Sequence, residues 1–287
     1  MNKAQWITIV IGVLIVAALF LFGRTGPYKS AIAKNFQSTP QNELTADSIL
    51  FHAKEILSPA QIQWMNDLEQ SVIRGDVKKQ KLDVFHQLAH FWKDSARIFE
   101  PYAWYEAEAA RLENSEKSLT FAAHLILENL RNEESEQLKR WKALQAKDLF
   151  ERSLRINDKN DSTIVGLGAC YIFGNIADNP MEGILKVRQV VERDSTNIYA
   201  QMVLGHGSLI SGQYDRAVDR FGKVLLLDPQ NLEAILMMAE VYERKADKPN
   251  AIKWYSNALP LAPSPNMKTA LEKRIEELSA RTPVEKK

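Results

Sequence analysis

The sequence predicts an all-α fold in which antiparallel helix pairs stack in series behind one N-terminal transmembrane helix. Three observations predict this arrangement. The chain opens with a long apolar run that contains no charged residue. After residue 44 the apolar residues recur with helical spacing and nowhere alternate as they do in a strand. Residue types also recur at intervals of 34 in the C-terminal part of the chain.

The first element is the apolar run, which spans Ala4–Gly23. About 20 helical residues, each rising about 1.5 Å, cross the hydrocarbon core of a bilayer. A cleaved signal peptide is the alternative, but the nearest small-x-small site, Ala31–Ala33, lies beyond Arg24 and Lys29 and too far from the run. We therefore expect residues 1–23 to form an uncleaved anchor that contacts the membrane through residues 4–23.

The orientation of this anchor is not fixed by charge. Lys3 precedes the run, whereas Arg24, Lys29 and Lys34 follow it, which leans slightly toward a cytoplasmic C-terminal domain. The export-like apolar start and the lack of thiol chemistry favour the opposite side. We expect a single-pass protein of a bacterial inner membrane with a periplasmic domain.

A tether and a helical hairpin follow the anchor. Residues 24–43 are rich in Gly, Pro, Ser, Thr, Asn and Gln and lack periodicity, which indicates an extended tether. Residues 44–80 predict two helices, Thr45–Leu57 and Pro59–Arg74. Ser58 is the expected N-cap of the second, with proline directly inside the helix.

The strongest signal is self-similarity in the last two repeats, Asn197–Asn231 and Leu232–Pro265. Four sets of matching residues stand 34 apart: Leu204-Gly205 and Met238-Ala239, Ala217 and Ala251, Phe221 and Tyr255, Pro229 and Pro263. Small residues let two antiparallel helices approach, aromatic ones fill the gaps between helices, and a proline ends a helix because it cannot donate to the ladder.

These residues and spacings resemble the tetratricopeptide repeat (TPR). The resemblance covers roughly residues 81–265, as about five units of which the first two are degenerate, and it implies a right-handed superhelix of antiparallel helix pairs. The whole layout is also similar to membrane-anchored TPR proteins of Bacteroidetes-type bacteria. Residues 266–287 are expected to form a capping helix, Met267–Ala280, and a tail.

The earlier units depart from the pattern in recognisable places. Leu167-Gly168-x-x-Tyr171 gives a first helix, and its second helix is expected from about Pro180 to Arg193. A charged insertion, Arg131–Arg140, is predicted between the two helices of the preceding unit. Its acidic stretch is expected to be solvated surface.

Several kinds of chemistry are not expected. The formal net charge of +1 gives no bulk attraction for nucleic acid, and the single cysteine, Cys170, rules out a disulfide. His86 and His90 stand one helical turn apart as in a zinc-peptidase helix, but Gln87 replaces the required general-base glutamate. The sequence predicts no cofactor, no metal and no catalysis. A metal-dependent enzyme using the two histidines stays as the alternative.

The expected function is that of a scaffold or assembly factor that binds a partner peptide or helix in the concave groove. In proteins of this kind, groove residues fall at fixed places in each first helix. Those places select Val165, Ala169, Phe173, Tyr199, Met202, His206, Leu209, Ile210, Glu240 and Arg244. Two alternatives stay open: the apolar groove is filled by the protein's own helices, or the protein associates with itself.

Overall fold

The computed structural model describes residues 44–74, 78–176 and 180–280, and all the regular structure in these ranges is helical. The α-helices are α3 (Ala46–Lys54), α4 (Pro59–Arg74), α5 (Lys78–His90), α6 (Phe99–Glu113), α7 (Glu116–Leu130), α8 (Glu136–Ile156), α9 (Asp161–Phe173), α10 (Met181–Arg193), α11 (Ile198–Ile210), α12 (Tyr214–Leu227), α13 (Leu232–Arg244), α14 (Lys248–Ala258) and α15 (Pro265–Ser279). A π-helical turn, η1 (Phe91–Ala96), follows α5, and a 3₁₀ turn, η2 (Leu259–Leu261), follows α14.

The first helices of three consecutive units begin in the same way. Asn160, Asn197 and Asn231 each accept a hydrogen bond from the backbone N–H three residues later, at 3.0, 2.9 and 3.0 Å. Such a cap satisfies one of the unpaired N–H groups at a helix start. Ser58 caps α4 as predicted, because its hydroxyl accepts from the Gln61 N–H while the Gln61 side chain accepts from the Ser58 N–H.

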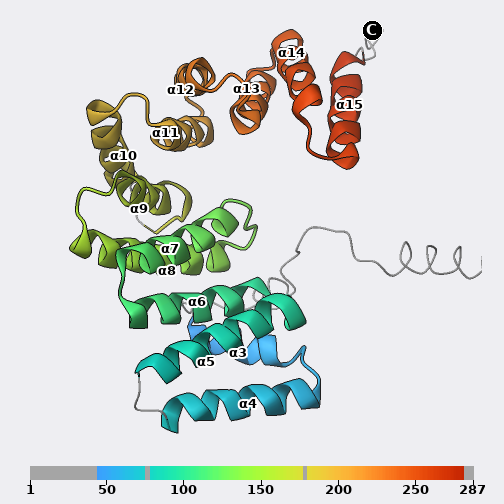
Figure 1. Ribbon diagram of the computed structural model, residues 1–287. Coiled ribbons are helices and arrows are strands. Elements are labelled where there is room, and N and C mark those ends of the chain that lie inside the picture. The colour runs from blue at the N-terminus through green and yellow to red at the C-terminus, as the bar shows by residue number, and fades with distance from the viewer. Residues whose placement is uncertain (1–43, 75–77, 177–179, 281–287) are drawn as a thin grey trace, which may run out of the picture.

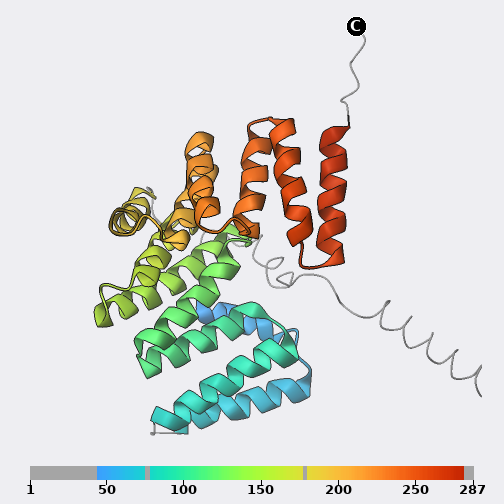
Figure 2. The same cartoon turned by 45° about the horizontal axis from the view of Figure 1, so that its top comes forward.

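The helices from α5 onward pack as consecutive pairs: α5 with α6, α7 with α8, α9 with α10, α11 with α12, and α13 with α14. Each pair also packs against the next, and α15 covers the last one (Figure 1). The stack curves into an arc with α9, α11 and α13 on its inner side and α10, α12 and α14 on its outer side. Figure 2 shows α13, α14 and α15 lying side by side at the C-terminal end. The predicted all-helical solenoid is confirmed.

Glycines mark the places where paired helices cross closely. A Cβ atom on Gly205 of α11 would lie 2.5 Å from Cε1 of Phe221, which is fully buried on α12. A Cβ on Gly168 of α9 would lie 2.5 Å from Val187 and 2.8 Å from the Gly183 carbonyl of α10. These glycines therefore allow the paired helices to pack closely.

Glu69 attaches the N-terminal hairpin to the stack. Its carboxylate, on α4, accepts hydrogen bonds from Tyr105 of α6 at 2.5 Å and from Lys54 of α3 at 2.8 Å. Burial, followed by the hydrogen bond to Glu69, raises the pKa of Tyr105. Trp92 and Met65 are fully buried in the core beneath this contact. The hairpin is therefore packed onto α5 and α6 and continues the stack.

The predicted charged insertion, Arg131–Arg140, is shorter than expected and partly buried. Helix α8 already begins at Glu136, because Ser135 caps it. The expectation that the acidic stretch is solvated was wrong for Glu133, whose carboxylate lies 2.5 Å from the buried ammonium of Lys142. Glu100 of α6 pairs with the same ammonium at 2.9 Å. Glu100 of α6, Glu133 of the α7–α8 connection and Lys142 of α8 thus form one buried cluster.

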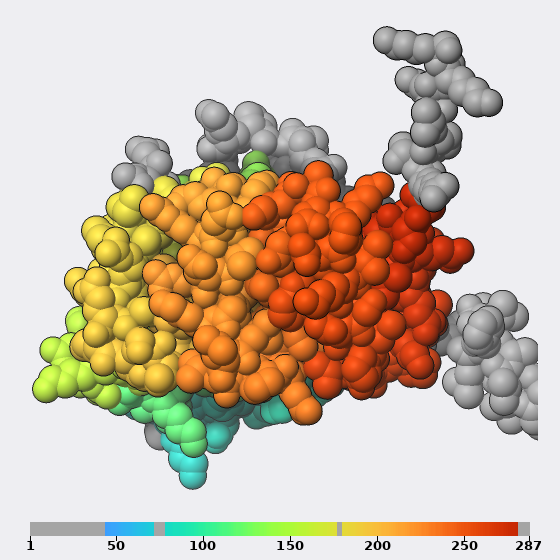
Figure 3. Space-filling view, turned by 90° about the horizontal axis from the view of Figure 1, so that it is seen from above, coloured from blue at the N-terminus to red at the C-terminus, as the bar shows by residue number. Residues whose placement is uncertain are grey.

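Two predicted segments lie outside the described residues: the anchor at residues 1–23 and the tether at 24–43. Among the helices that the structure does describe, none is both long and apolar enough to cross a bilayer. The predicted capping helix corresponds to α15, whose single buried residue is Leu271. Seen from above, the helices α10 to α15 form one continuous surface in chain order (Figure 3).

Candidate functional site in the concave face

A cavity of about 440 Å³ opens on the inner side of the arc. Its walls come from the first helices of four consecutive units, α7, α9, α11 and α13. The lining residues are His124, Leu127, Glu128, Arg131, Ala169, Phe173, Ile198, Tyr199, Met202, Val203, His206, Asn231 and Glu233. Cavities that bind ligands have this composition, an apolar lining with a few polar groups.

The structure brings half of the predicted groove residues together at this cavity. Phe173 lies on its α9 wall and Tyr199, Met202 and His206 lie along α11, while Ala169 forms part of the floor. Their role in binding a partner stays a prediction, but their common location follows from the spacing of residues on neighbouring first helices.

The other predicted groove residues lie elsewhere. Val165 and Leu209 are 0% and 4% exposed and pack in the core, so their side chains are not available to a ligand. Ile210 is 66% exposed but lies outside the cavity. Glu240 and Arg244 pair with each other one turn apart on α13, at 2.7 Å. The groove residues were predicted from fixed places in each first helix, and these places do not take the curvature of the stack into account. They therefore include residues of the core and residues outside the cavity.

Eight lining residues were missed by the sequence interpretation, although part of the signal was present. His124, Leu127 and Glu128 fall nine, twelve and thirteen places after the α7 cap, Ser115. The same places after the α11 cap hold His206, Leu209 and Ile210. The degenerate motif of α7 hid this equivalence. The rest of the missed set is Arg131, Ile198, Val203, Asn231 and Glu233, of which Glu233 takes the second place after its own cap, as Tyr199 does.

A polar cluster closes the cavity at the ends of α7 and α13. The Arg131 guanidinium donates to Glu233 Oε1 at 2.6 Å, across 102 residues of sequence. His206 Nε2 lies 3.1 Å from the same oxygen and 2.7 Å from the guanidinium. The hydrogen bond from His206, supported by Arg131, lowers the pKa of Glu233 to about 2. Glu233 is therefore a carboxylate at any physiological pH.

Aromatic rings form the opposite wall. The His124 ring stands edge-on to Tyr199, with 5.6 Å between centroids, and Phe173 stands edge-on to His206 at 6.2 Å. Burial lowers the pKa of His124, so this ring is neutral at pH 7. Burial also raises the pKa of Tyr199. Rings fixed in this way offer apolar contact area at a low entropic cost to a ligand.

The cysteine and the histidine pair that the sequence analysis considered do not line this cavity. Cys170 is fully buried, and burial raises the pKa of its thiol. His86 and His90 lie on α5, away from the concave cavity. His86 faces Glu106 of α6 at 3.8 Å, and His90 faces Asp94 of η1 at 3.4 Å. Across residues 44–74, 78–176 and 180–280, no three His, Cys, Asp or Glu side chains gather as a metal site would require.

Comparison with known proteins agrees with the repeat motif. The family model described as tetratricopeptide repeat matches residues 208–273, where the 34-residue pattern is strongest. No curated protein matches the chain.

Two solved structures are similar to the chain at low sequence identity. The crystal structure of YrrB, described as a TPR protein with an unusual peptide-binding site, has a TM-score of 0.41 and 16% identity over 72% of this chain and 97% of that one. MamA from Desulfovibrio magneticus RS-1 has a TM-score of 0.41 and 18% identity over 65% and 96%. In the structure, the segment that the family model identifies as tetratricopeptide repeat, residues 208–273, is part of a longer stack of helix pairs that begins at α5.

Proposed function

We propose that this protein is a non-catalytic, membrane-anchored scaffold that binds a partner peptide or helix in the concave cavity. The observation that carries the proposal is the cavity itself, which four first helices line with aromatic and aliphatic side chains beneath a charged rim. Apolar anchors surrounded by polar groups are the arrangement in which peptide and helix ligands are held. Stacked helical pairs provide a concave surface of this kind.

The cavity is open on one side and bridged on the other. Glu128 is exposed at its rim, whereas Arg131 reaches across to Glu233 and limits the length of any ligand that lies along the inner side of the arc. A short peptide or a single helical turn therefore fits better than a long helix that crosses the whole stack.

Site-specific photocrosslinking tests the proposal. A photoreactive phenylalanine analogue replaces Glu128 at the rim in one variant and the exposed Lys253 of α14 in a matched control, both in the full chain in native membranes. We expect discrete adducts from position 128 and none from position 253. Equal adducts at both positions, or none at position 128, would contradict binding in the cavity.

The membrane part of the proposal rests on the charge-free run Ala4–Gly23. We propose that this segment holds the domain, through the tether at residues 24–43, on the periplasmic side of the inner membrane. Protease added to spheroplasts should digest residues 44–280 while cytoplasmic proteins stay intact. Protection of the domain until the membrane is lysed would place it on the cytoplasmic side.

A further inference from the structure

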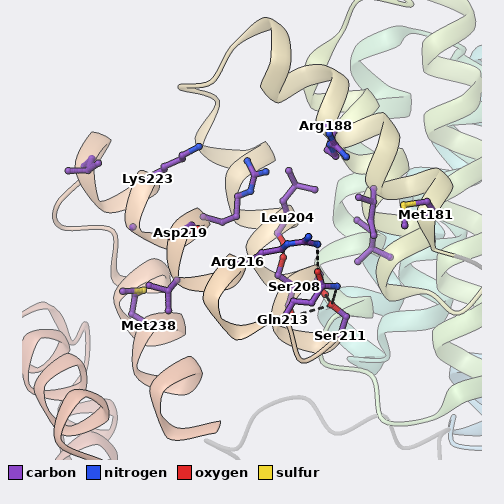
Figure 4. A pocket seen from close by; sticks show the side chains of 17 residues that line it. Met181, Arg188, Leu204, Ser208, Ser211, Gln213, Arg216, Asp219, Lys223 and Met238 are labelled. Atoms are coloured by element: carbon purple, nitrogen blue, oxygen red, sulfur yellow. Dashed lines mark hydrogen bonds between the residues drawn. The ribbon is translucent and has the colours of Figure 1, made fainter. Parts of the chain in front are cut away.

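A second and larger cavity lies on the opposite, outer side of the arc. It is a cleft of about 920 Å³ between the second helices α10 and α12, with α11 as its floor (Figure 4). Figure 4 shows Met181 and Arg188 on the α10 side, facing Arg216, Asp219 and Lys223 of α12 across Leu204 and Ser208 of α11. This cleft shares no lining residue with the concave cavity.

Positive charge collects in the cleft. Arg188, Arg216, Arg220 and Lys223 line it, and Asp219 is the one carboxylate among its described lining residues. Burial lowers the pKa of the Arg220 guanidinium, and the nearby cations Arg188 and Arg216 act in the same direction, against Asp219. Like charges placed this close raise the local potential for an anion.

Among the described residues, the hydrogen-bond partners of Arg216 and Arg220 are neutral. Arg216 and Arg220 donate to the neutral amides of Gln213 and Gln201. Arg188 has one carboxylate, Glu192, at 3.7 Å on its own helix. Neutral amides hold a guanidinium in place without neutralising it. A ligand carboxylate would therefore meet charges that are already positioned.

Apolar surface accompanies the charge along both walls. Met181 and Ile184 share one face of α10 with Arg188, at intervals of three and four residues, and Met181 is 47% exposed. Leu226 of α12 is 84% exposed. Ile172 and Leu204 contribute to the floor. An exposed apolar face beside a fixed set of cations indicates a ligand with both properties.

We propose that the cleft between α10 and α12 binds an acidic peptide segment of a partner protein, in which carboxylate side chains alternate with apolar ones. The carboxylates pair with Arg188, Arg216 and Lys223, and the apolar side chains contact Met181, Ile184 and Leu226. This site is separate from the concave cavity, so the protein holds two ligands on opposite faces of one stack.

Other anionic ligands fit the cleft less well. None of the described residues that line it is aromatic, whereas single-stranded nucleic acid is held by base stacking on aromatic rings. A flat anionic bilayer cannot reach the floor formed by Leu204 and Ser208 between the two helices. A peptide can, because alternating side chains enter a cleft while its backbone stays outside.

Peptide selection on the intact protein tests the inference. The full-length chain is placed in phosphatidylcholine nanodiscs, which carry no net charge, and a phage library of random twelve-residue peptides is selected on it. A parallel selection uses the Arg188→Glu/Lys223→Glu variant. Both side chains are exposed, so the reversal should leave the circular dichroism spectrum unchanged. We expect peptides rich in Asp and Glu interspersed with Leu, Ile or Phe from the first selection alone.

Affinity measurements then locate the site. For an enriched peptide, the double charge reversal should raise Kd at least about tenfold, the effect of roughly one lost charge contact. Lys248→Glu/Lys253→Glu on α14, a matched reversal outside the cleft, should change Kd less than about twofold. Glu128→Arg, in the concave cavity, should have no effect, which separates this inference from the function proposed above.

Three results would overturn the inference. The first is the absence of acidic enrichment in the selection. The second is equal weakening of binding by the α14 reversal. The third is binding to phosphatidylglycerol vesicles that is lost in the Arg188→Glu/Lys223→Glu variant while no acidic peptide binds, since the ligand would then be an anionic lipid surface.

Discussion

His206 and Glu233 belong to neighbouring repeat units and contact each other, with 3.1 Å between Nε2 and Oε1. His206 lies in the middle of α11, and Glu233 lies in the first turn of α13. The imidazole nitrogen also faces the Arg131 guanidinium at 2.7 Å. One nitrogen cannot donate to the carboxylate and accept from the guanidinium at once. The tautomer of His206 therefore decides which neighbour it binds at the edge of the concave cavity.

The low pKa of Glu233 predicts how stability depends on pH. A carboxyl group whose pKa is lower in the folded than in the unfolded state stabilises the fold above its unfolded pKa and loses this contribution as the pH falls. For Glu233 the loss runs from about 4.5 down to about 2. We expect Glu233→Gln to be less stable than the native chain at pH 7 and to differ little from it near pH 2.

Urea denaturation across this pH range measures the effect. Because Glu233 is 47% exposed, solvent screens the contact and the difference at pH 7 should stay at or below about 1 kcal/mol. Glu277→Gln, on the outer helix α15, is the control. A stability difference that persists unchanged down to pH 2 would contradict the assignment.

The buried ammonium of Lys142 predicts a large effect of a single substitution. Lys142→Met removes the positive charge that faces Glu100 and Glu133, and Glu100 is 1% exposed. Breaking a buried ion pair on one side costs about 3–5 kcal/mol. Lys139→Met on the same helix, whose partner Glu136 is exposed, should cost less than about 1 kcal/mol. Chemical denaturation of both variants distinguishes them, and equal costs would refute a structural role for the buried cluster.

Two glycines in one repeat predict opposite results for the same substitution. Gly205→Ala places a methyl group against the buried Phe221 ring and should destabilise by about 1–3 kcal/mol. At Gly222 a methyl group meets open space, so Gly222→Ala should stabilise by up to about 1 kcal/mol through helix propensity. Thermal melts of the two variants test this. Changes of the same sign would mean that the α11–α12 crossing is looser than described.

Substitution of Phe173 should weaken ligand binding at the concave cavity without unfolding the protein. Met202 is only 7% exposed, so a charge there would unfold the region and report nothing about binding. Phe173 is half-buried on the cavity wall, and Phe173→Ala combined with Glu128→Arg changes the surface that a ligand meets. We expect at least about tenfold weaker partner binding with an unchanged helical spectrum. Undiminished binding would remove the cavity from the proposed function.

Local rules were sufficient for most of the fold. The start of α4 was predicted from Ser58 and Pro59, and the end of α12 before Pro229, because caps and prolines act within one turn. The 34-residue interval marked Gly205 as a position of close helix approach and Phe221 as a gap-filling residue for the same reason, and the structure shows that the two lie against each other. These features depend on neighbours in sequence or in the same repeat, so a single sequence contains them.

The candidate site was predicted only in part, because it depends on distant contacts. Arg131 reaches Glu233 owing to the curvature of the whole stack, which no local spacing encodes. Burial of Glu133 depends on Lys142 of α8, which also faces Glu100 of α6. Charged residues in a connecting segment are usually exposed, and the sequence contained no sign that a buried ammonium lies next to this one.

The contact between Arg131 and Glu233 also affects how the protein unfolds. In a simple solenoid each unit contacts only its neighbours, so destabilisation of one end has a decreasing effect on units farther along the stack. Here a chain truncated before Leu232 would lose the carboxylate that a guanidinium three units upstream requires. Local unfolding at the C-terminus would thus also affect the middle of the protein. The stack should therefore unfold more cooperatively than a solenoid of the same length that lacks this contact.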